Sequence, residues 1–271
     1  MGRTLRALSL DVVAGALCGG LLAESVGEVR MRGAWWVALA AAVWSVYTGD
    51  HLLDALRSPG PLLAERHAFH RRHARFLVPA LGFALLAGLG ASLFLRAPVR
   101  HAGLFLTALV ALYLLSAQNL ALPRLPKEPS AALLYAAGIW MGPIILSDEP
   151  AFVLASAASL QALAAFLNLV CIGCFESEVD QSLGARSLAR RFGADRVARA
   201  VMVSGAAGTL LAAALAIPSR GARSLAFAVL GVQVALPALM LFRRAWFGAR
   251  ERYRSVGDAV FLLGALPRLL G

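Results

Sequence analysis

Two acidic clusters stand at the ends of long apolar stretches, and they contain the side chains best suited to chemistry in this sequence. The first is DHLLD, with Asp50 and Asp54, and the second is ESEVD, with Glu176 and Asp180. In each cluster the two carboxylates are four positions apart, so they share one helical face, where like charges repel. Ionisable groups at the edge of a hydrocarbon layer are costly and tend to mark function. A cation between the carboxylates would relieve the repulsion, and we expect that cation to be Mg²⁺.

The composition places these clusters in a membrane protein. The chain has 271 residues, of which 59% are hydrophobic and 15% are charged, and its mean hydropathy is +0.72. A soluble domain carries more charge and less apolar sequence than this. Runs such as Leu77 to Leu95 and Pro129 to Ser147 are long enough to cross about 30 Å of hydrocarbon as helices. We therefore expect an all-α polytopic membrane protein that forms one integral domain over residues 1–271.

Apolar windows divide the chain into nine predicted membrane helices. The last of them is short and contains Pro267, so it either spans the membrane or lies at its interface. The start of the chain resembles a signal peptide, but Asp11 and Glu24 interrupt its apolar run, and we interpret it as the first membrane helix. The approximate ranges of the nine segments are 8–26, 33–54, 76–95, 101–122, 129–147, 151–175, 197–217, 223–242 and 257–270.

Basic residues predict which side of the membrane each loop faces. Most of the 26 Lys and Arg residues fall in loops that share one side when the N-terminus is placed in the cytoplasm. The two longest of these loops, 55–75 and 176–196, adjoin or contain the acidic clusters. The net charge of +11 therefore reflects topology and lipid head groups and does not indicate nucleic acid. We expect a multi-pass protein of the inner (cytoplasmic) membrane, with its active site towards the cytoplasm.

The second and sixth predicted helices share a pattern. Each ends in carboxylates four positions apart and leads into an arginine-rich loop, and four segments separate the two. This spacing predicts two four-helix pseudo-repeats plus one extra helix. Internal repeats often place their functional groups face to face across a shared cavity.

Arginines beside paired carboxylates suit a substrate that carries phosphates. Mg²⁺ binds a few carboxylates together with phosphate oxygens and waters, and arginine contacts phosphate through two parallel hydrogen bonds. The apolar helices around the site favour a substrate with a long hydrocarbon, and an isoprenyl diphosphate has this shape. The alternative is interfacial: each cluster consists of solvated acids at a helix end that pair weakly with nearby arginines.

The stretch ESEVDQSLGARSLARRFG, from Glu176 to Gly193, resembles the second acidic motif of the UbiA superfamily of intramembrane prenyltransferases. The likeness consists of an acidic DxxxD pattern, a glycine four residues later, a basic residue two beyond that and a closing glycine. DHLLD is similar to the second half of the family's first motif, NDxxDxxxD. Nine helices, an inside N-terminus and acidic motifs on the second and sixth helices also agree, so the resemblance spans nearly the whole chain.

The resemblance implies roles for single residues. It implies that Mg²⁺ ions bridging to prenyl diphosphate are held by Asp50, Asp54, Glu176 and Asp180. It also implies that basic residues contact the diphosphate, and the candidates are Arg186, Lys127, Arg124 and Arg57.

The chain departs from the family's pattern at the first motif. Val46 and Tyr47 stand where the motif begins Asn-Asp, and Glu176 replaces the more usual Asp in the second motif. The loop after the first motif reads ERHAFHRRHARF in place of an Arg-Pro-Leu element. Its three histidines suit a basic interfacial helix, a diphosphate contact or a metal site, and they are His67, His70 and His73.

Two further polar side chains lie close to the clusters in the sequence. Tyr47 precedes the first cluster and either stabilises a carbocation with its ring or belongs to an aromatic belt at the interface. Asn168 lies two turns before the second cluster as a candidate buried amide.

The resemblance implies an activity. The expected enzyme is a Mg²⁺-dependent prenyltransferase that ionises a polyprenyl diphosphate and passes the prenyl group to an acceptor, within a water-poor cavity. The sequence leaves the acceptor, the prenyl chain length and the oligomeric state open. Two alternatives stand beside this expectation: a terpene cyclase of the same superfamily that uses the same site, and a non-catalytic lipid-binding membrane protein that keeps the scaffold.

Overall fold

The computed structural model describes residues 8–57, 65–117, 126–177 and 187–270, and all regular structure in these ranges is helical. The long helices are α2 (Leu10–Gly27), α3 (Gly33–Arg57), α4 (Glu65–Ser92), α5 (Ala97–Ala117), α6 (Lys127–Leu146), α7 (Ala151–Phe175), α10 (Ala194–Ala216) and α11 (Gly221–Phe242). The shorter elements are α9 (Leu188–Phe192), α12 (Arg244–Gly248), η1 (Ala249–Glu251), α13 (Arg252–Ala259), η2 (Val260–Ala265) and α14 (Leu266–Leu270).

Seven of the described helices are long and apolar enough to cross a membrane: α2, α4, α5, α6, α7, α10 and α11. This supports the predicted all-α membrane fold, whereas the count of nine spans is not confirmed. The second predicted segment forms α3, which is 25 residues long but carries polar and charged residues in its last turns and is not among the seven. The ninth forms no long helix and consists of α13, η2 and α14 in succession.

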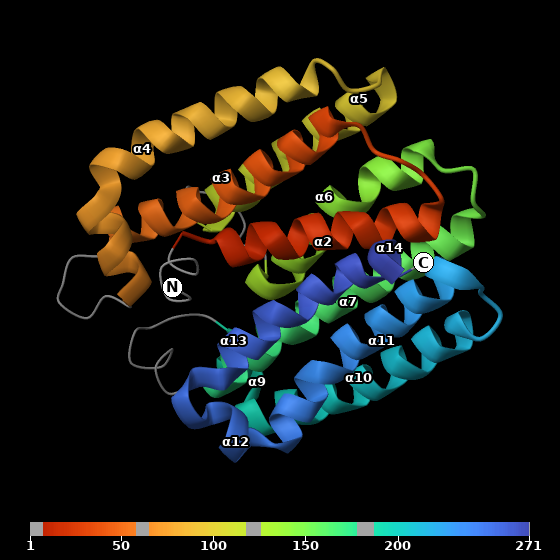
Figure 1. Ribbon diagram of the computed structural model, residues 1–271. Coiled ribbons are helices and arrows are strands. Elements are labelled where there is room, and N and C mark those ends of the chain that lie inside the picture. Colours follow the sequence, from red (N-terminus) through yellow and green to blue (C-terminus); the bar gives the residue numbers. More distant parts are fainter. Residues whose placement is uncertain (1–7, 58–64, 118–125, 178–186, 271) are drawn as a thin grey trace.

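The long helices run back and forth between two ends of the molecule (Figure 1). One end, which we name the acidic-motif end, is where α3 finishes at Arg57 and α7 finishes at Phe175. The other, the turn end, holds the turns between α2 and α3, α4 and α5, α6 and α7, and α10 and α11. Both acidic clusters therefore follow or end helices at the same end, as the segment pattern predicts.

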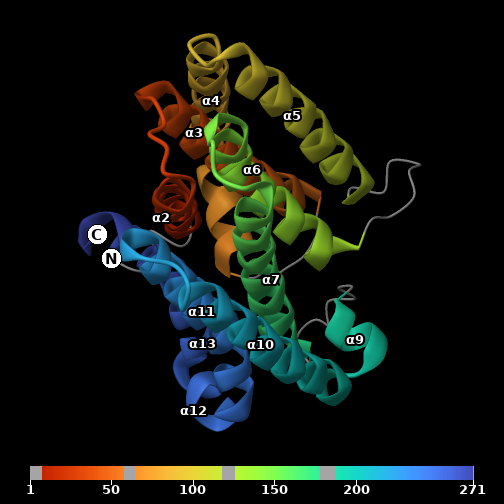
Figure 2. The ribbon, with the colours of Figure 1, turned by 90° about the vertical axis from the view of Figure 1, so that its right-hand side faces the viewer.

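Burial differs strongly among the helices. Half of the apolar window of α7 and slightly more of that of α11 are buried, and these two helices pack against each other and against α2, α6 and α10. In α4 only 6% of the window is buried, and Phe83 on this helix is 74% exposed. Figure 2 shows α4 and α5 as an outer layer on one side of the bundle. Large apolar side chains exposed on such helices suit contact with lipid tails.

Small residues bring the inner helices close together. A side chain at Gly208 on α10 would overlap Val234 of α11 and Leu163 of α7. Likewise, a side chain at Gly264 would overlap the backbone at Cys18, so the C-terminal segment lies directly against α2. Because hydrocarbon gives no hydrophobic drive between helices, close packing of this kind is a main source of association in a bilayer.

Candidate functional site

The structure describes the side chains of only some predicted site residues. Asp50, Glu176 and Lys127 are described, and all three lie at the acidic-motif end. Asp54 and Arg57 lie in the last turn of α3, but their side chains fall outside the described part of the chain. The other three predicted residues lie wholly outside the described residues, and they are Arg124, Asp180 and Arg186. Their assignments stay predictions.

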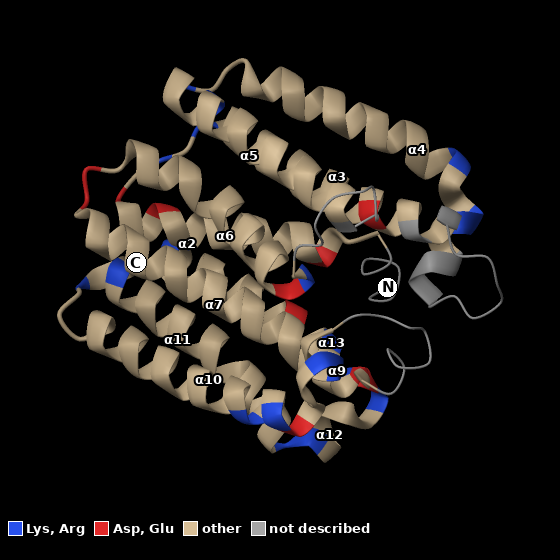
Figure 3. Ribbon diagram, turned by 180° about the vertical axis from the view of Figure 1, so that it is seen from behind, with Lys and Arg blue, Asp and Glu red and all other residues tan. Residues whose placement is uncertain are grey.

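Charged residues gather at the two ends of the helices and leave the middle of the bundle almost free of charge (Figure 3). This distribution follows from the cost of placing charge in hydrocarbon. It also means that carboxylates from different helices meet at the helix ends.

The first cluster lies close to carboxylates that the sequence interpretation did not include. Tyr47, one turn before Asp50 on α3, lies within electrostatic range of Asp50, of Asp11 on α2 and of Asp258 on α13. Asp11 and Asp258 are 247 positions apart in the sequence, and both lie near Tyr47 because α13 packs against α2. The structure thus adds two acidic residues to the surroundings of the first cluster.

Two further tyrosines lie near Tyr47 and these carboxylates. Tyr47 on α3 lies within electrostatic range of Tyr113 on α5 and of Tyr135 on α6. Tyr135 also lies near Asp258 and makes an edge-to-face contact with Phe261, with ring centroids 6.0 Å apart. Tyrosines from three helices therefore lie near one another and near these carboxylates.

Glu176 of the second cluster caps the C-terminus of α7 and is tied to α13. Arg254 Nη2 lies 2.7 Å from Glu176 Oε1, and the Tyr253 hydroxyl donates a hydrogen bond of 3.2 Å to the same oxygen. The Glu176 side chain is 15% exposed. This ion pair is the arrangement that the interfacial alternative predicts, and the sequence did not indicate either partner.

The segment α12–α13 is built around the end of α7. The ring of Tyr253 stacks on Phe175 with centroids 4.5 Å apart, and Arg244 Nη2 donates a hydrogen bond of 3.0 Å to the Cys174 carbonyl. Cations at a helix C-terminus interact favourably with its dipole and its unpaired carbonyls. Arg250 and Glu251 both have positive φ, an uncommon conformation for residues other than glycine, and this bend returns the chain along α7.

The surroundings of Tyr253 favour its neutral form. Burial raises the pKa of Tyr253 above its usual range, and the charge of Glu176 acts in the same direction against the opposing effect of Arg254. A neutral hydroxyl can donate to the Glu176 carboxylate, so the observed hydrogen bond agrees with this shift.

Glu128 connects the start of α6 to the chain that follows the second cluster. Its Oε1 accepts a hydrogen bond of 2.8 Å from the backbone N–H of Leu188 in the first turn of α9. Ser187 caps the same helix, accepting a hydrogen bond from the N–H of Arg190. The contact places α9 beside the exposed Lys127, so two basic segments of the predicted site adjoin each other.

The histidines of the predicted loop lie on a helix. Residues 65–73 form the first turns of α4, and the interfacial role expected for them stays a prediction. The His70 side chain is fully buried and packs edge-to-face against His51, with ring centroids 5.2 Å apart. His73 Nδ1 lies 2.9 Å from the Phe69 carbonyl. The side chains of His70 and His73 therefore have packing roles within the α3–α4 pair.

Asn168 also has a packing role. It is buried on α7, and a side chain at Gly257 would overlap it, so the absence of one there lets α13 approach α7. The amide thus sits between the two helices that carry Glu176 and Tyr253.

The donor chemistry at the acidic-motif end suits Mg²⁺. Carboxylates lie on α2, α3 and α13 and at the C-terminus of α7, and Mg²⁺ needs only one or two of them when substrate phosphates and waters complete its octahedron. Among the described residues, no group of three or more His, Cys, Asp or Glu side chains converges as a ready-made cage. A site of this kind therefore depends on substrate oxygens.

Comparisons with known proteins give no match. No family model, no curated protein and no solved structure matches this chain. The resemblance to the UbiA superfamily accordingly rests on the two motifs and their placement, and the function is argued from the site.

Proposed function

We propose that this protein is a Mg²⁺-dependent intramembrane prenyltransferase, a divergent member of the UbiA superfamily, in the inner membrane with its site facing the cytoplasm. The observation that supports it best is that carboxylates of both predicted motifs lie at one end of an apolar helical bundle, where three tyrosines lie near the first motif. A polar head and a hydrocarbon chain on one substrate would match these two surroundings. Basic residues are also concentrated in the segments that flank this end.

Four carboxylates would hold the metal in this proposal: Asp50, Asp54, Glu176 and Asp180. Bound there, Mg²⁺ would neutralise charge on the diphosphate as it leaves. Basic side chains would bind the phosphate oxygens directly, and they are Arg186, Lys127, Arg124 and Arg57. Arg254, already paired with Glu176, adds positive charge at the same place. Charge-assisted hydrogen bonds of this kind stabilise the diphosphate most where its negative charge increases.

The reaction breaks the bond between the allylic carbon and the diphosphate oxygen, and both electrons leave with the diphosphate. The acceptor then donates an electron pair to the allylic cation, forms the new bond and loses a proton. The faces of Tyr47 and Tyr135 would stabilise the cation, and the surrounding apolar helices would exclude water that could trap it.

The tyrosine group also favours a second candidate, a terpene cyclase that uses the same diphosphate site. Aromatic faces around a cation assist its capture by a double bond of its own chain. Purified protein incubated with farnesyl or geranylgeranyl diphosphate and no acceptor separates the two, because only a cyclase then yields a cyclised hydrocarbon.

The Glu176–Arg254 ion pair favours a third candidate, a non-catalytic lipid-binding protein in which Glu176 is purely structural. The deciding experiment measures Mg²⁺-dependent diphosphate release with a panel of prenyl diphosphates in the wild type and in Asp54→Ala and Asp180→Ala. A prenyltransferase or cyclase loses this release in both variants. Full release in both would reject the metal site.

A further inference from the structure

A small pocket with a basic rim lies at the turn end, on the side of the molecule opposite to the acidic clusters. Its volume is ≈ 60 Å³, enough for several waters or one tetrahedral oxyanion. Three arginines line it, Arg30 and Arg32 from the α2–α3 turn and Arg96 from the α4–α5 turn. The remaining wall is mainly apolar and includes Trp35, Val99 and Leu146.

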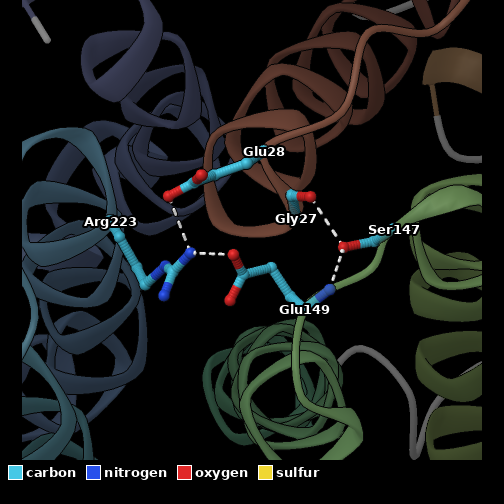
Figure 4. A network of polar contacts seen from close by, with 5 residues as sticks. All are labelled: Gly27, Glu28, Ser147, Glu149 and Arg223. Atoms are coloured by element: carbon cyan, nitrogen blue, oxygen red, sulfur yellow. Dashed lines mark hydrogen bonds and ion pairs between the residues drawn. The ribbon is translucent and has the colours of Figure 1, made fainter.

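Most of the described carboxylates at the turn end are engaged by other groups. Arg223 at the start of α11 binds two of them, with Nη2 lying 2.8 Å from Glu28 Oε1 and 2.6 Å from Glu149 Oε1 (Figure 4). Glu24 is buried, and its Oε1 accepts a hydrogen bond of 2.5 Å from the N–H of Met31. Asp148 is exposed in the α6–α7 turn and forms no ion pair within the part of the chain that the structure describes.

The three pocket arginines are therefore left with an excess of positive charge. Within the described ranges none of them is in an ion pair, although Arg30 lies within electrostatic range of the buried Glu24. Topology does not account for them either, because the positive-inside rule makes basic residues scarce at this end of the molecule. Three arginines around one pocket thus call for an anionic ligand.

We propose that this pocket binds the phosphate group of an anionic amphiphile. Guanidinium groups recognise phosphate with paired hydrogen bonds. The apolar wall at Trp35, Val99 and Leu146 would contact the first carbons beyond the phosphate, and the turn end is where the bundle would meet lipid head groups. A phospholipid with a net negative charge and a free phosphate ion share the phosphate chemistry, and they differ in whether the apolar wall contributes.

The test is titration calorimetry on the purified full-length protein in a neutral detergent, without Mg²⁺ or prenyl diphosphate. Three probes are compared: dioctanoyl phosphatidylglycerol, zwitterionic dioctanoyl phosphatidylcholine and inorganic phosphate. We expect the anionic lipid to bind more tightly than the zwitterionic one. If inorganic phosphate binds as tightly as the anionic lipid, the site belongs to a soluble phosphate; weaker binding of the ion assigns it to the head group.

Variants locate the binding. Arg96→Gln should weaken binding of the anionic lipid by about tenfold, because it removes a charge-assisted hydrogen bond. Arg100→Gln is the matched control, since it makes the same charge change one turn further along α5, outside the pocket, and it should change binding less than twofold. Arg30→Gln provides a second pocket variant, and should Arg96→Gln not fold, it takes its place.

Equal losses in the pocket variants and in Arg100→Gln would overturn the proposal, as would equal affinity for the two lipids. Either result would mean that overall charge or the apolar tails, and not this pocket, account for the binding.

Discussion

Each end of the bundle holds a local group of charged side chains, and the two groups are opposite in sign. At the turn end, Arg223 binds Glu28 and Glu149 and leaves three arginines in excess around a pocket. At the acidic-motif end, Arg254 binds Glu176, while Asp11, Asp50 and Asp258 gather around Tyr47. A carboxylate or an arginine alone therefore says little about function. What distinguishes the two groups is the sign of the charge that gathers locally, carboxylates around Tyr47 and arginines around the pocket, and this favours a cation in the first and an anion in the second.

The ion pairs at the two ends also differ in whether they only join helices or adjoin a candidate ligand site. Arg223 joins three turns, and its own side chain and that of Glu149 are mostly shielded from water, which suits a structural role. The Glu176–Arg254 pair has a similar distance but lies at the end of the bundle that also holds the first acidic cluster, so it can be both a cross-link and part of a binding site. The predictions below test this difference.

The largest effect is expected at the acidic-motif end. Asp50→Ala should lower Mg²⁺-dependent diphosphate release by at least about a hundredfold, because it removes a proposed metal ligand where leaving-group charge develops. Release of diphosphate from farnesyl or geranylgeranyl diphosphate is the measurement.

Asp148→Ala is the matched control for that variant, since it removes a carboxylate from the turn end. Its release rate should stay within twofold of the wild type. Comparable losses in the two variants would remove the distinction between the ends.

Much of the fold, and less of the site, could be predicted from the sequence. Long apolar runs mark the helices, because backbone in hydrocarbon must satisfy its own hydrogen bonds, and the predicted ranges for α6 and α7 agree closely with the observed ones. The two motifs were placed at one end by counting helices. Asp258 and Tyr253 were missed because their relevance depends on how the last segment packs, and Tyr253 is 77 positions from Glu176. The run RERYR at 250–254 was the available signal, but it was interpreted only as a topology determinant.

Arg254→Gln separates the two roles of Glu176. If Glu176 binds metal, removing its competing cation should lower the Mg²⁺ concentration for half-maximal diphosphate release by about tenfold, since two cations near one carboxylate repel. The free energy of unfolding should fall by about 1 kcal/mol with the loss of the ion pair. A stability loss without any change in Mg²⁺ dependence would leave Glu176 with a structural role alone.

Arg223→Gln tests whether the two ion pairs of Arg223 stabilise the turn end. It leaves Glu28 and Glu149 without their cation and should lower the free energy of unfolding by about 1 to 2 kcal/mol, with diphosphate release unchanged. Thermal unfolding in detergent measures the stability. Arg220→Gln, an exposed arginine three positions earlier, serves as the control and should have little effect. An equal loss in both variants would contradict the specific role of Arg223.

The smallest effect concerns Tyr253 at alkaline pH. Because the pKa of Tyr253 is raised in the folded protein, this hydroxyl ionises first in the unfolded chain, at about pH 10. Its contribution to stability is complete below that pH and is lost as the pH rises through the folded pKa. Tyr253→Phe should therefore weaken the fall in stability above about pH 10, measured as the free energy of unfolding against pH. Identical pH profiles would show that Tyr253 is not shielded.

The most direct test of the central claim is binding without turnover. Thermal unfolding of the wild type is compared with and without Mg²⁺ plus a non-hydrolysable farnesyl diphosphate analogue, and then in Asp50→Ala and Asp148→Ala. A ligand that binds only the folded state must stabilise it. We predict a Mg²⁺-dependent rise in the unfolding temperature in the wild type and Asp148→Ala that is lost in Asp50→Ala. No rise in the wild type, or an equal rise in all three proteins, would contradict a metal and diphosphate site at the acidic-motif end.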